Sequence, residues 1–223
     1  MIRFEHLTKI FTLEGQHKTV ADDINLTFPT GRAVGLLGRN GAGKSTLLQM
    51  IAGTLTPTSG RIVSTGTISW PVGFAGSFHP DLSGAENTRF VGRIYGVDTD
   101  ELIAFVEDFA GLETHFRLPF RSYSSGMKSR LAFGVSMGIG FDTYLVDEVT
   151  AVGDAAFRER SAQVFMERMK TSGAVVVSHG MSQVRQLCDA TAVLHEGKLT
   201  YYDDVDEGIE RHEENMAKLN APR

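Results

Sequence analysis

The chain has 223 residues, of which 42% are hydrophobic and 22% charged, and its formal net charge is −5. This composition is typical of a globular protein with one α/β domain and an appended subdomain, and the acidic balance excludes a general basic surface for nucleic acid. A single cysteine, Cys188, excludes intrachain disulfides and thiolate-rich metal sites. The N-terminus lacks signal-peptide features, and the most apolar stretch, residues 131–141, is shorter than a membrane span. We therefore expect any membrane association to depend on a partner.

The first third of the chain contains several strand-like runs and one helix-like run. Strands are predicted at residues 2–4, 24–28, 33–37, 60–64 and 67–70. The first two are expected to form an antiparallel edge sheet, and the last two a pair joined by a turn at Thr65-Gly66. A helix is expected over residues 46–52, with Gly53 ending it.

From about residue 74 to 140 the pattern is helical and predicts an inserted subdomain, which leaves residues 1–73 and 141–223 as the catalytic core. Within this subdomain, Thr99 is expected to cap a helix that Gly111 ends. The spacing of its apolar residues predicts one buried face, made of Leu102, Ile103, Phe105, Val106 and Phe109.

The alternation of helices and strands then resumes. Helices are predicted at residues 128–137, 154–170 and 182–188, and strands at 144–146, 174–177, 191–194 and 198–202. The polar tail from Asp203 is expected to form a short helix with a frayed end. Strands alternating with helices predict a largely parallel sheet with helices on its faces.

The stretch Gly38–Ser45 matches the phosphate-binding loop pattern G-x-x-x-x-G-K-[ST], between a predicted strand and a predicted helix. Glycines let backbone N–H groups surround phosphate oxygens, Lys44 adds a charge for the β- and γ-phosphates, and the Ser45 hydroxyl suits Mg²⁺. The alternative is a plain glycine turn, which the flanking elements disfavour. The residues expected to bind a nucleotide here are Gly38, Arg39, Asn40, Gly41, Ala42, Gly43, Lys44, Ser45 and Thr46.

Two acids, Asp147 and Glu148, follow the apolar run Tyr144-Leu145-Val146. At the end of a buried strand in a phosphate-loop protein, Asp147 is suited to hold Mg²⁺ and Glu148 to polarise an attacking water. The alternative is a solvated acidic pair at a strand end. The phosphate loop upstream favours the catalytic interpretation.

Two further candidates for ligand contact lie at the ends of predicted elements. Ser124, Ser125 and Gly126 precede a helix whose free N–H groups and dipole favour an anion, although an ordinary helix cap is the alternative. His179 follows a strand and is expected to point into the crevice at the carboxyl ends of the parallel strands, although a core histidine is the alternative.

Together these motifs resemble those of the ATP-binding subunits of ABC transporters, and the resemblance covers essentially the whole chain. The family's phosphate loop corresponds to Gly38–Ser45. Its signature motif corresponds to Ser124–Gly126, where Tyr-Ser-Ser-Gly-Met stands in place of the commonest Leu-Ser-Gly-Gly-Gln. The aromatic residue that stacks on adenine in this family is expected to be Phe11, with His17 the weaker candidate.

The resemblance also implies the chemistry of single residues. The implied cofactors are ATP and Mg²⁺. Mg²⁺ is expected on Ser45 and Asp147, and the implied catalytic residues are Lys44, Glu148 and His179.

The implied fold is a P-loop NTPase of the RecA-like type. It has a mostly parallel sheet core, an antiparallel β edge and an inserted helical subdomain, in a single ABC ATPase domain over residues 1–223. Two copies are expected to form a homodimer. In it, Gly38–Ser45 of one copy and Ser124–Gly126 of the other enclose ATP, while residues 151–154 join the two protomers.

The sequence departs from the family pattern at one position. A glutamine that usually contacts Mg²⁺, the lytic water and the membrane partner has no counterpart, because no glutamine occurs from residue 50 to 162. Its expected place falls near Phe74, and this site stays unassigned.

Residues 69–74, 76–84, 123–133 and 147–154 are similar to the ATPases that export bacterial surface polysaccharides. The Trp70-Pro71 pair and the short C-terminus most resemble capsular polysaccharide exporters of Gram-negative bacteria. The resemblance implies an integral membrane permease, periplasmic or outer-membrane export components, and a peripheral location on the cytoplasmic face of the inner membrane. It implies no nucleic acid partner.

The cleft for the membrane channel is expected around residues 74–95. Its candidate lining residues are Trp70, Phe74, Phe78, Phe90 and Tyr95, although aromatic residues in such a stretch more often belong to the core.

Three alternatives to capsule export stay open. The same transport ATPase could serve another substrate, such as O-antigen, teichoic acid, a lipid, a drug or a nutrient. A soluble ABC-type switch would usually need a second ATPase unit, a coiled coil or basic arms. A small-molecule kinase would need an acceptor-binding lid.

Overall fold

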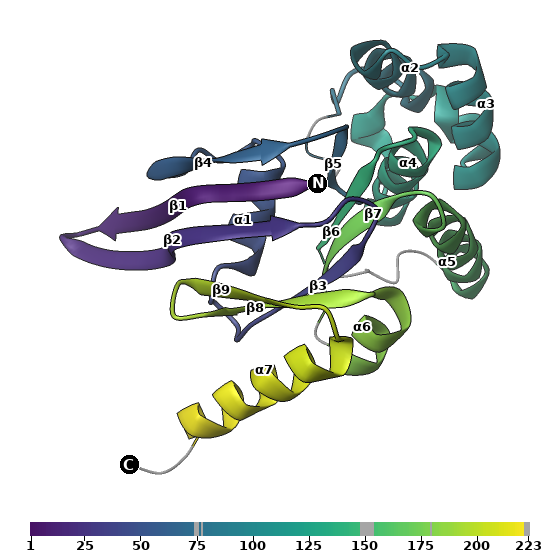
Figure 1. Cartoon of the computed structure of the whole chain (residues 1–223). Helices are drawn as coiled ribbons and strands as arrows, with labels where there is room; N and C mark the ends of the chain where they lie inside the picture. Colours follow the sequence, from purple (N-terminus) through teal and green to yellow (C-terminus); the bar gives the residue numbers. More distant parts are fainter. Residues whose placement is uncertain (74–75, 77, 148–153, 179, 221–223) are drawn as a thin grey trace. The chain divides into compact units, whose positions relative to one another are not determined.

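The structure, a computed structural model, describes residues 1–73, 76, 78–147, 154–178 and 180–220 (Figure 1). Its contacts divide the chain into two compact units. The first unit comprises Met1–Pro71, Asp142–Val149 and Thr171–Arg223, and the second comprises Val72–Phe141 and Thr150–Lys170. The second unit therefore includes residues 150–170, which the sequence assigned to the core.

The first unit contains an antiparallel sheet of β1 (Ile2–Leu13), β2 (Gln16–Phe28) and β4 (Ser59–Ser64), in the order β2-β1-β4. The predicted antiparallel edge is confirmed, since Ile2 pairs with Phe28, but both strands are much longer than the predicted runs. The predicted runs are the ends of the strands farthest from the hairpin turn. Toward the turn most residues are exposed, and the strands connect at Glu14-Gly15, where both residues have positive φ, as a type I′ hairpin turn requires.

The second sheet of this unit has the strand order β5-β6-β7-β3-β8-β9. Its strands are β3 (Ala33–Leu37), β5 (Ile68–Pro71), β6 (Thr143–Asp147), β7 (Gly173–Val177), β8 (Ala190–His195) and β9 (Lys198–Tyr202). All neighbours pair in parallel except β8 and β9. Every residue of the central strands β3 and β7 is buried, as expected for strands of a parallel sheet covered on both faces.

The predicted pairing of the two strands around Thr65-Gly66 is wrong. Strand β4 pairs with β1 and strand β5 pairs with β6, so the turn connects two different sheets. The Asp142 carboxylate accepts hydrogen bonds from the Thr67 N–H at 2.7 Å and the Thr67 hydroxyl at 2.9 Å. Thr143 N–H donates to Thr67 O at 3.1 Å. These long-range bonds hold the start of β5 beside β6, and no local sequence pattern reports them.

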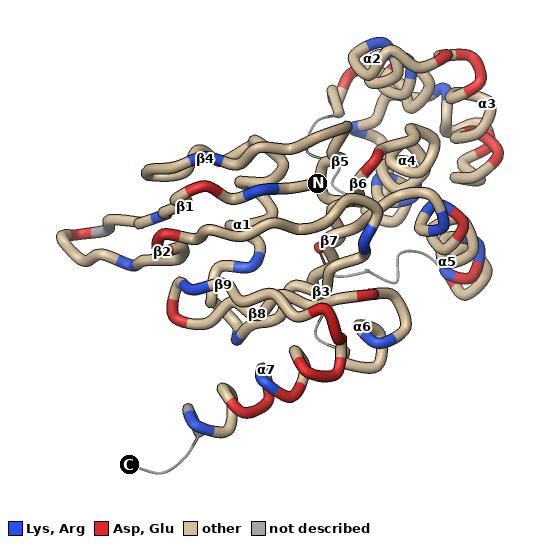
Figure 2. The backbone as a smooth tube through the Cα atoms, in the orientation of Figure 1, with Lys and Arg blue, Asp and Glu red and all other residues tan. Residues whose placement is uncertain are grey.

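Three helices complete the first unit: α1 (Lys44–Ile51), α6 (Met181–Leu187) and α7 (Val205–Asn220). Helix α1 follows β3 and packs its buried face into the core that the two sheets share, which includes Leu36, Leu48 and Phe4. Helix α7 lies along β8 and β9 (Figure 1), and its 16 residues make it longer than the short helix expected. Acidic residues are frequent along α7 (Figure 2).

The second unit is helical, with α2 (Gly84–Tyr95), α3 (Thr99–Ala110), α4 (Ser125–Gly138) and α5 (Ala155–Met169). Two 3₁₀ turns, η1 (Glu113–Arg117) and η2 (Phe120–Ser122), lead into α4. Helix α5 belongs to this unit because Phe157 packs on Phe109 with ring centroids 5.2 Å apart, and Arg168 Nε donates to Met137 O at 2.8 Å.

The predicted end of α3 at Gly111 is confirmed, and so is its buried apolar face, except that Phe105 is only partly buried. Its predicted cap is wrong by one residue. The Asp98 side chain accepts hydrogen bonds from the N–H groups of Asp100 and Glu101, and Thr99 is the first helical residue. A carboxylate accepts two N–H groups here, and Asp is a stronger N-cap than Thr.

Candidate nucleotide site

A pocket of about 370 Å³ lies in the first unit, where β3 ends and α1 begins. Its volume falls in the range of small-molecule sites. Three features that are far apart in the sequence contribute to it: the phosphate loop, the N-terminal hairpin and the end of β6. The lining residues are Phe11, Lys18, Val20, Asn40, Gly41, Gly43, Lys44, Ser45, Thr46, Asp147 and Val177.

The phosphate loop passes so close to β2 that only glycine fits at its end. Gly43 precedes α1 with φ of 109°, and a Cβ there would lie 2.0 Å from Val20 Cγ1. Because Gly43 has no side chain, the N–H groups of the first turn of α1 carry no side-chain cap. Uncapped N–H groups at a helix N-terminus, with the positive end of the helix dipole, form an anion site.

The Lys44 ammonium lies within this loop. Lys44 is buried, and its Nζ donates to Gly38 O at 2.7 Å and to Arg39 O at 3.2 Å. These bonds span the loop from its last residues to its first. The lysine thus places a positive charge beside the N–H groups that point into the pocket.

The Asp147 carboxylate and the Ser45 hydroxyl line the same pocket. Asp147 is the last residue of β6 and pairs with Val177 of β7, while Ser45 is the second residue of α1. Mg²⁺ bound to nucleotides takes one or two carboxylates, a hydroxyl, water and phosphate oxygens, so these two side chains suit it. The predicted catalytic residues Glu148 and His179 lie outside the described residues, as do residues 151–153 and Phe74.

The hairpin of β1 and β2 brings Phe11 to the pocket. Phe11 is 41% exposed, pairs with Lys18 across the hairpin, and has Lys9 Nζ 4.9 Å from its ring centroid. The alternative, His17, pairs with Thr12 and hydrogen-bonds its hydroxyl at 3.0 Å, and it is not among the described residues that line the pocket.

Sequence reasoning missed Lys18 and Val20. Lys18 Nζ lies 4.0 Å from the position that a Cβ on Gly41 would take, so the hairpin adds a second cation to the pocket. The sequence feature that would have placed Lys18 beside Phe11 is the Glu14-Gly15 turn. A two-residue turn there fixes the register that sets Lys18 opposite Phe11.

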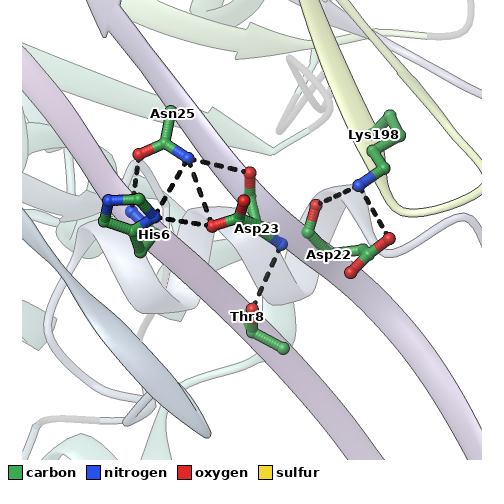
Figure 3. A network of polar contacts seen from close by, with 6 residues as sticks. All are labelled: His6, Thr8, Asp22, Asp23, Asn25 and Lys198. Carbon is green, nitrogen blue, oxygen red and sulfur yellow. Dashed lines mark hydrogen bonds and ion pairs between the residues drawn. The ribbon is translucent and has the colours of Figure 1, made fainter.

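Polar contacts tie this hairpin to the turn between β8 and β9 (Figure 3). Lys198 Nζ lies 2.7 Å from the Asp22 carboxylate, and Asp22 N–H donates to Gly197 O at 2.9 Å. One residue further on, Asp23 is 2.8 Å from His6 Nδ1, and its carboxylate also accepts from Asn25. These bonds to His6 and then Asn25 lower the pKa of Asp23. Strand β2, which carries Lys18 and Val20, is therefore held at its middle.

The predicted signature residues lie in the second unit. Ser124 caps α4, its hydroxyl accepting from Met127 N–H at 3.3 Å, and Ser125 is the first helical residue. A pocket of about 300 Å³ opens here. It is lined by Gly111, Leu112, Glu113, His115, Ser124, Gly126, Met127 and Arg130.

Arg130 connects this pocket to the start of α5. Its guanidinium pairs with Asp154 at 2.7 Å and lies 4.9 Å from the Phe157 ring centroid. The Phe157 N–H, followed by Arg130, lowers the pKa of Asp154. Asp154 is the N-cap of α5 and the last residue of the segment 151–154 that is expected to join two protomers.

Comparison with known proteins gives relatives over nearly the full length. The family model described as "ABC transporter" matches residues 21–151. The chain is 49% identical to the polysialic acid transport ATP-binding protein KpsT of Escherichia coli, over 95% of this chain and 96% of that protein. It is 43% identical to the capsule polysaccharide export ATP-binding protein CtrD of Neisseria meningitidis serogroup B, over 94% and 97%. An O-antigen export ATP-binding protein, RfbB of Klebsiella pneumoniae, is 34% identical over 92% and 85%.

A solved structure supports the fold. A dimeric ATP-binding cassette in a post-hydrolysis state with ADP and Pi superposes with a TM-score of 0.74 at 20% identity, covering 89% of this chain and 96% of that one. The architecture is thus that of the P-loop ATP-binding cassettes, as the sequence predicted. Within the described part of the chain, no helix has the length and hydropathy needed to cross a bilayer.

Proposed function

Because the chain belongs to the ABC transporter family, we propose that it is the ATP-hydrolysing subunit of an exporter for a capsular polysaccharide. The observation that carries the proposal is the pocket that joins Phe11, the phosphate loop and Asp147. The substrate class rests on the relatives. Those named for polysialic acid and capsule polysaccharide are 49% and 43% identical over nearly the whole chain, while O-antigen export relatives are 34% identical over 92% of it and 40% identical over 80% of it.

In the proposed site the first unit holds ATP. The N–H groups at the start of α1 and the Lys44 ammonium bind the β- and γ-phosphates, and Phe11 stacks on adenine. Ser45 and Asp147 hold Mg²⁺, which neutralises charge on the phosphates. Residues 38–46 form the cradle, and Lys18 adds positive charge at its rim.

The second unit supplies the other half of the site in a second copy. Ser124, Ser125 and Gly126 at the start of α4 close over the γ-phosphate bound to the partner's loop, so that ATP joins two copies into a homodimer. Both units together make one ABC ATPase domain. Phosphoryl transfer to water needs positioning and charge stabilisation more than covalent chemistry. Glu148 orients or deprotonates the water, and His179 contacts the γ-phosphate.

The membrane partner is proposed to dock on α2. Phe90 and Ile94 lie one turn apart on this helix and are 54% and 62% exposed, which is unusual for large apolar side chains. The other expected lining residues divide. Phe78 is buried against Phe120, with ring centroids 5.3 Å apart, whereas Tyr95 packs on Phe141 at 5.1 Å and is still 40% exposed. The exposed α2 face is therefore the part of residues 74–95 that suits a partner, an integral permease at the cytoplasmic face of the inner membrane.

The proposal is tested by deleting the gene in the native bacterium and locating the capsule. We expect polysaccharide to accumulate inside the cell, and expression of the wild-type chain to restore it to the surface. The tagged chain should co-purify from detergent-solubilised membranes with an integral membrane protein. A normal surface capsule in the deletion strain would contradict the substrate assignment, and if O-antigen is lost from the surface instead, the runner-up substrate is favoured. Recovery of the chain entirely in the soluble fraction, without a membrane protein, would favour a soluble ATP switch.

A further inference from the structure

The segment before the signature residues is tied to the start of α2 through Tyr123. Its hydroxyl donates to His115 O at 2.7 Å and accepts from Gly84 N–H at 3.1 Å. The side chain is 4% exposed, and burial raises the pKa of Tyr123, so the hydroxyl keeps its proton and can donate. Leucine, the commonest residue at this point of the family motif, could make neither bond.

The Tyr123 hydroxyl approaches the first residue of α2 so closely that a side chain there would clash with it. A Cβ on Gly84 would lie 2.5 Å from the Tyr123 hydroxyl and 2.9 Å from Phe116 Cδ2. Gly84 is the first residue of α2, and a reciprocal capping box between Ser83 and Glu86 fixes this end of the helix. The Tyr123 hydroxyl thus contacts a rigid helix end.

The two chain segments around this contact are also joined by their backbones. Phe120 N–H donates to Leu82 O at 2.9 Å, and Arg121 N–H donates to Pro80 O at 2.8 Å. The buried Asn87 amide of α2 holds the same loop, accepting from His79 N–H at 2.8 Å and donating to Leu82 O at 3.1 Å. The loop before α2 and the residues before α4 therefore form one hydrogen-bonded unit.

This hydrogen-bonded group of residues before α2 and α4 lies between two surfaces to which the proposed function gives different roles. One is the exposed α2 face of Phe90 and Ile94, and the other is the start of α4 at Ser124. Resting on that function, we propose that Tyr123 is a positioning residue whose hydroxyl couples the position of α2, set by the membrane partner, to Ser124 in the ATP site. The residue binds no nucleotide itself.

The test uses Tyr123→Phe, which removes only the hydroxyl, in the exporter purified with its membrane partner. ATP hydrolysis is measured as kcat and KM, and ATP binding with a fluorescent ATP analogue. We expect kcat to fall about tenfold, the effect of one buried hydrogen bond that is lost at the transition state, with KM and ATP affinity within about twofold of wild type. A role in fold stability alone would lower the melting temperature without this split between kcat and KM.

The matched control is Ser122→Ala. Ser122 lies one residue before Tyr123, is exposed, and its hydroxyl donates within its own turn to Pro119 O at 2.6 Å. We expect wild-type kcat from this variant. A loss of kcat equal to that of Tyr123→Phe would show that the segment tolerates no change, and would overturn the assignment to the Tyr123 hydroxyl.

Gly84→Ala tests the same contact from the other side. The added methyl group would clash with the Tyr123 hydroxyl, and Tyr123→Phe removes that hydroxyl. The losses in kcat of the two substitutions should therefore be less than additive. Additive losses, or a Tyr123→Phe enzyme with wild-type kcat, would overturn the proposal. A wild-type complex without ATP hydrolysis, or a chain without a membrane partner, would overturn the proposed function instead and this inference with it.

Discussion

The pocket at the phosphate loop and the pocket at Ser124 both lie at the start of a helix, but they differ in how that start is completed. Helix α1 begins after Gly43 with no side-chain cap, and the Lys44 ammonium lies beside its N–H groups. Helix α4 begins after Ser124, whose hydroxyl already accepts a hydrogen bond from one N–H group of the first turn. Arg130 of the same helix is paired with Asp154. The first pocket is therefore suited to bind a polyphosphate alone. The second is suited to add contacts to a phosphate that another group already holds.

The largest effect is expected from Glu148→Gln, which removes the proposed base and leaves both pockets intact. ATP hydrolysis should fall by a factor on the order of 10² to 10⁴, the usual contribution of a general base, while ATP still binds. Because ATP is not consumed, the variant should form a dimer in ATP that light scattering detects. Normal hydrolysis by this variant would contradict the assigned mechanism.

Lys44→Ala should break the first pocket. Loss of a charge-assisted contact to the phosphates should weaken ATP binding by about 10- to 100-fold, measured by calorimetry on the isolated chain. Lys18→Gln is the matched control, because Lys18 lies at the rim of the same pocket, and we expect a smaller loss from it. Unchanged ATP affinity in Lys44→Ala would mean that the loop is only a structural turn.

Ser124→Arg should break the second pocket and spare the first. The long side chain would fill the pocket beside α4 and remove its cap, so ATP-dependent dimerisation should be lost. ATP affinity of the isolated chain should stay within about twofold, which corresponds to less than about 0.5 kcal/mol. Ser122→Arg, at an exposed position two residues earlier, is the matched control and should dimerise normally. Loss of ATP binding in Ser124→Arg would contradict the division of roles between the two pockets.

The smallest effect concerns His212 of α7. Burial lowers its pKa, the positive charges of Lys44 and His195 lower it further, and Glu213 acts in the opposite direction. Below its ordinary pKa of about 6.5 the unfolded chain therefore binds a proton that the folded chain resists, and the free energy of unfolding falls. We expect His212→Gln to lose less stability than wild type between about pH 6.5 and 5 in urea denaturation. Identical pH profiles would contradict this origin of the acid sensitivity.

Strands with a clear local boundary were the part of the fold that the sequence predicted best. The run 33–37 and the run 198–202 match β3 and β9 in full, because a continuous apolar run or a turn at Glu196-Gly197 defines each locally. The halves of β1 and β2 next to the hairpin turn were missed because most of their residues are exposed, and β-pairing there depends on the Glu14-Gly15 turn. The position of β5 depends on Asp142, 75 residues from Thr67.

The candidate site likewise contains residues that the sequence predicted and residues that it missed. The phosphate loop and Asp147 could be predicted because each motif is continuous in the sequence and lies at the end of a buried strand. Lys18 could not, because its place in the pocket follows from the hairpin register. The link through Tyr123 was also missed, although the capping box Ser83-Gly84-Ala85-Glu86 does mark the start of α2 in the sequence.

The central claim is that one ATP site takes its loop from one copy and its signature residues from the other. It is tested most directly by mixing Lys44→Ala chains with Ser124→Arg chains, each inactive alone, and measuring ATP hydrolysis. A mixed dimer then has both defects in one site and an intact second site, so hydrolysis should recover on mixing. The control is a chain with both substitutions, mixed with wild type, which leaves no intact site in the mixed dimer. This mixture should show no ATP hydrolysis beyond that of its wild-type dimers. Absence of recovery in the first mixture would contradict the account.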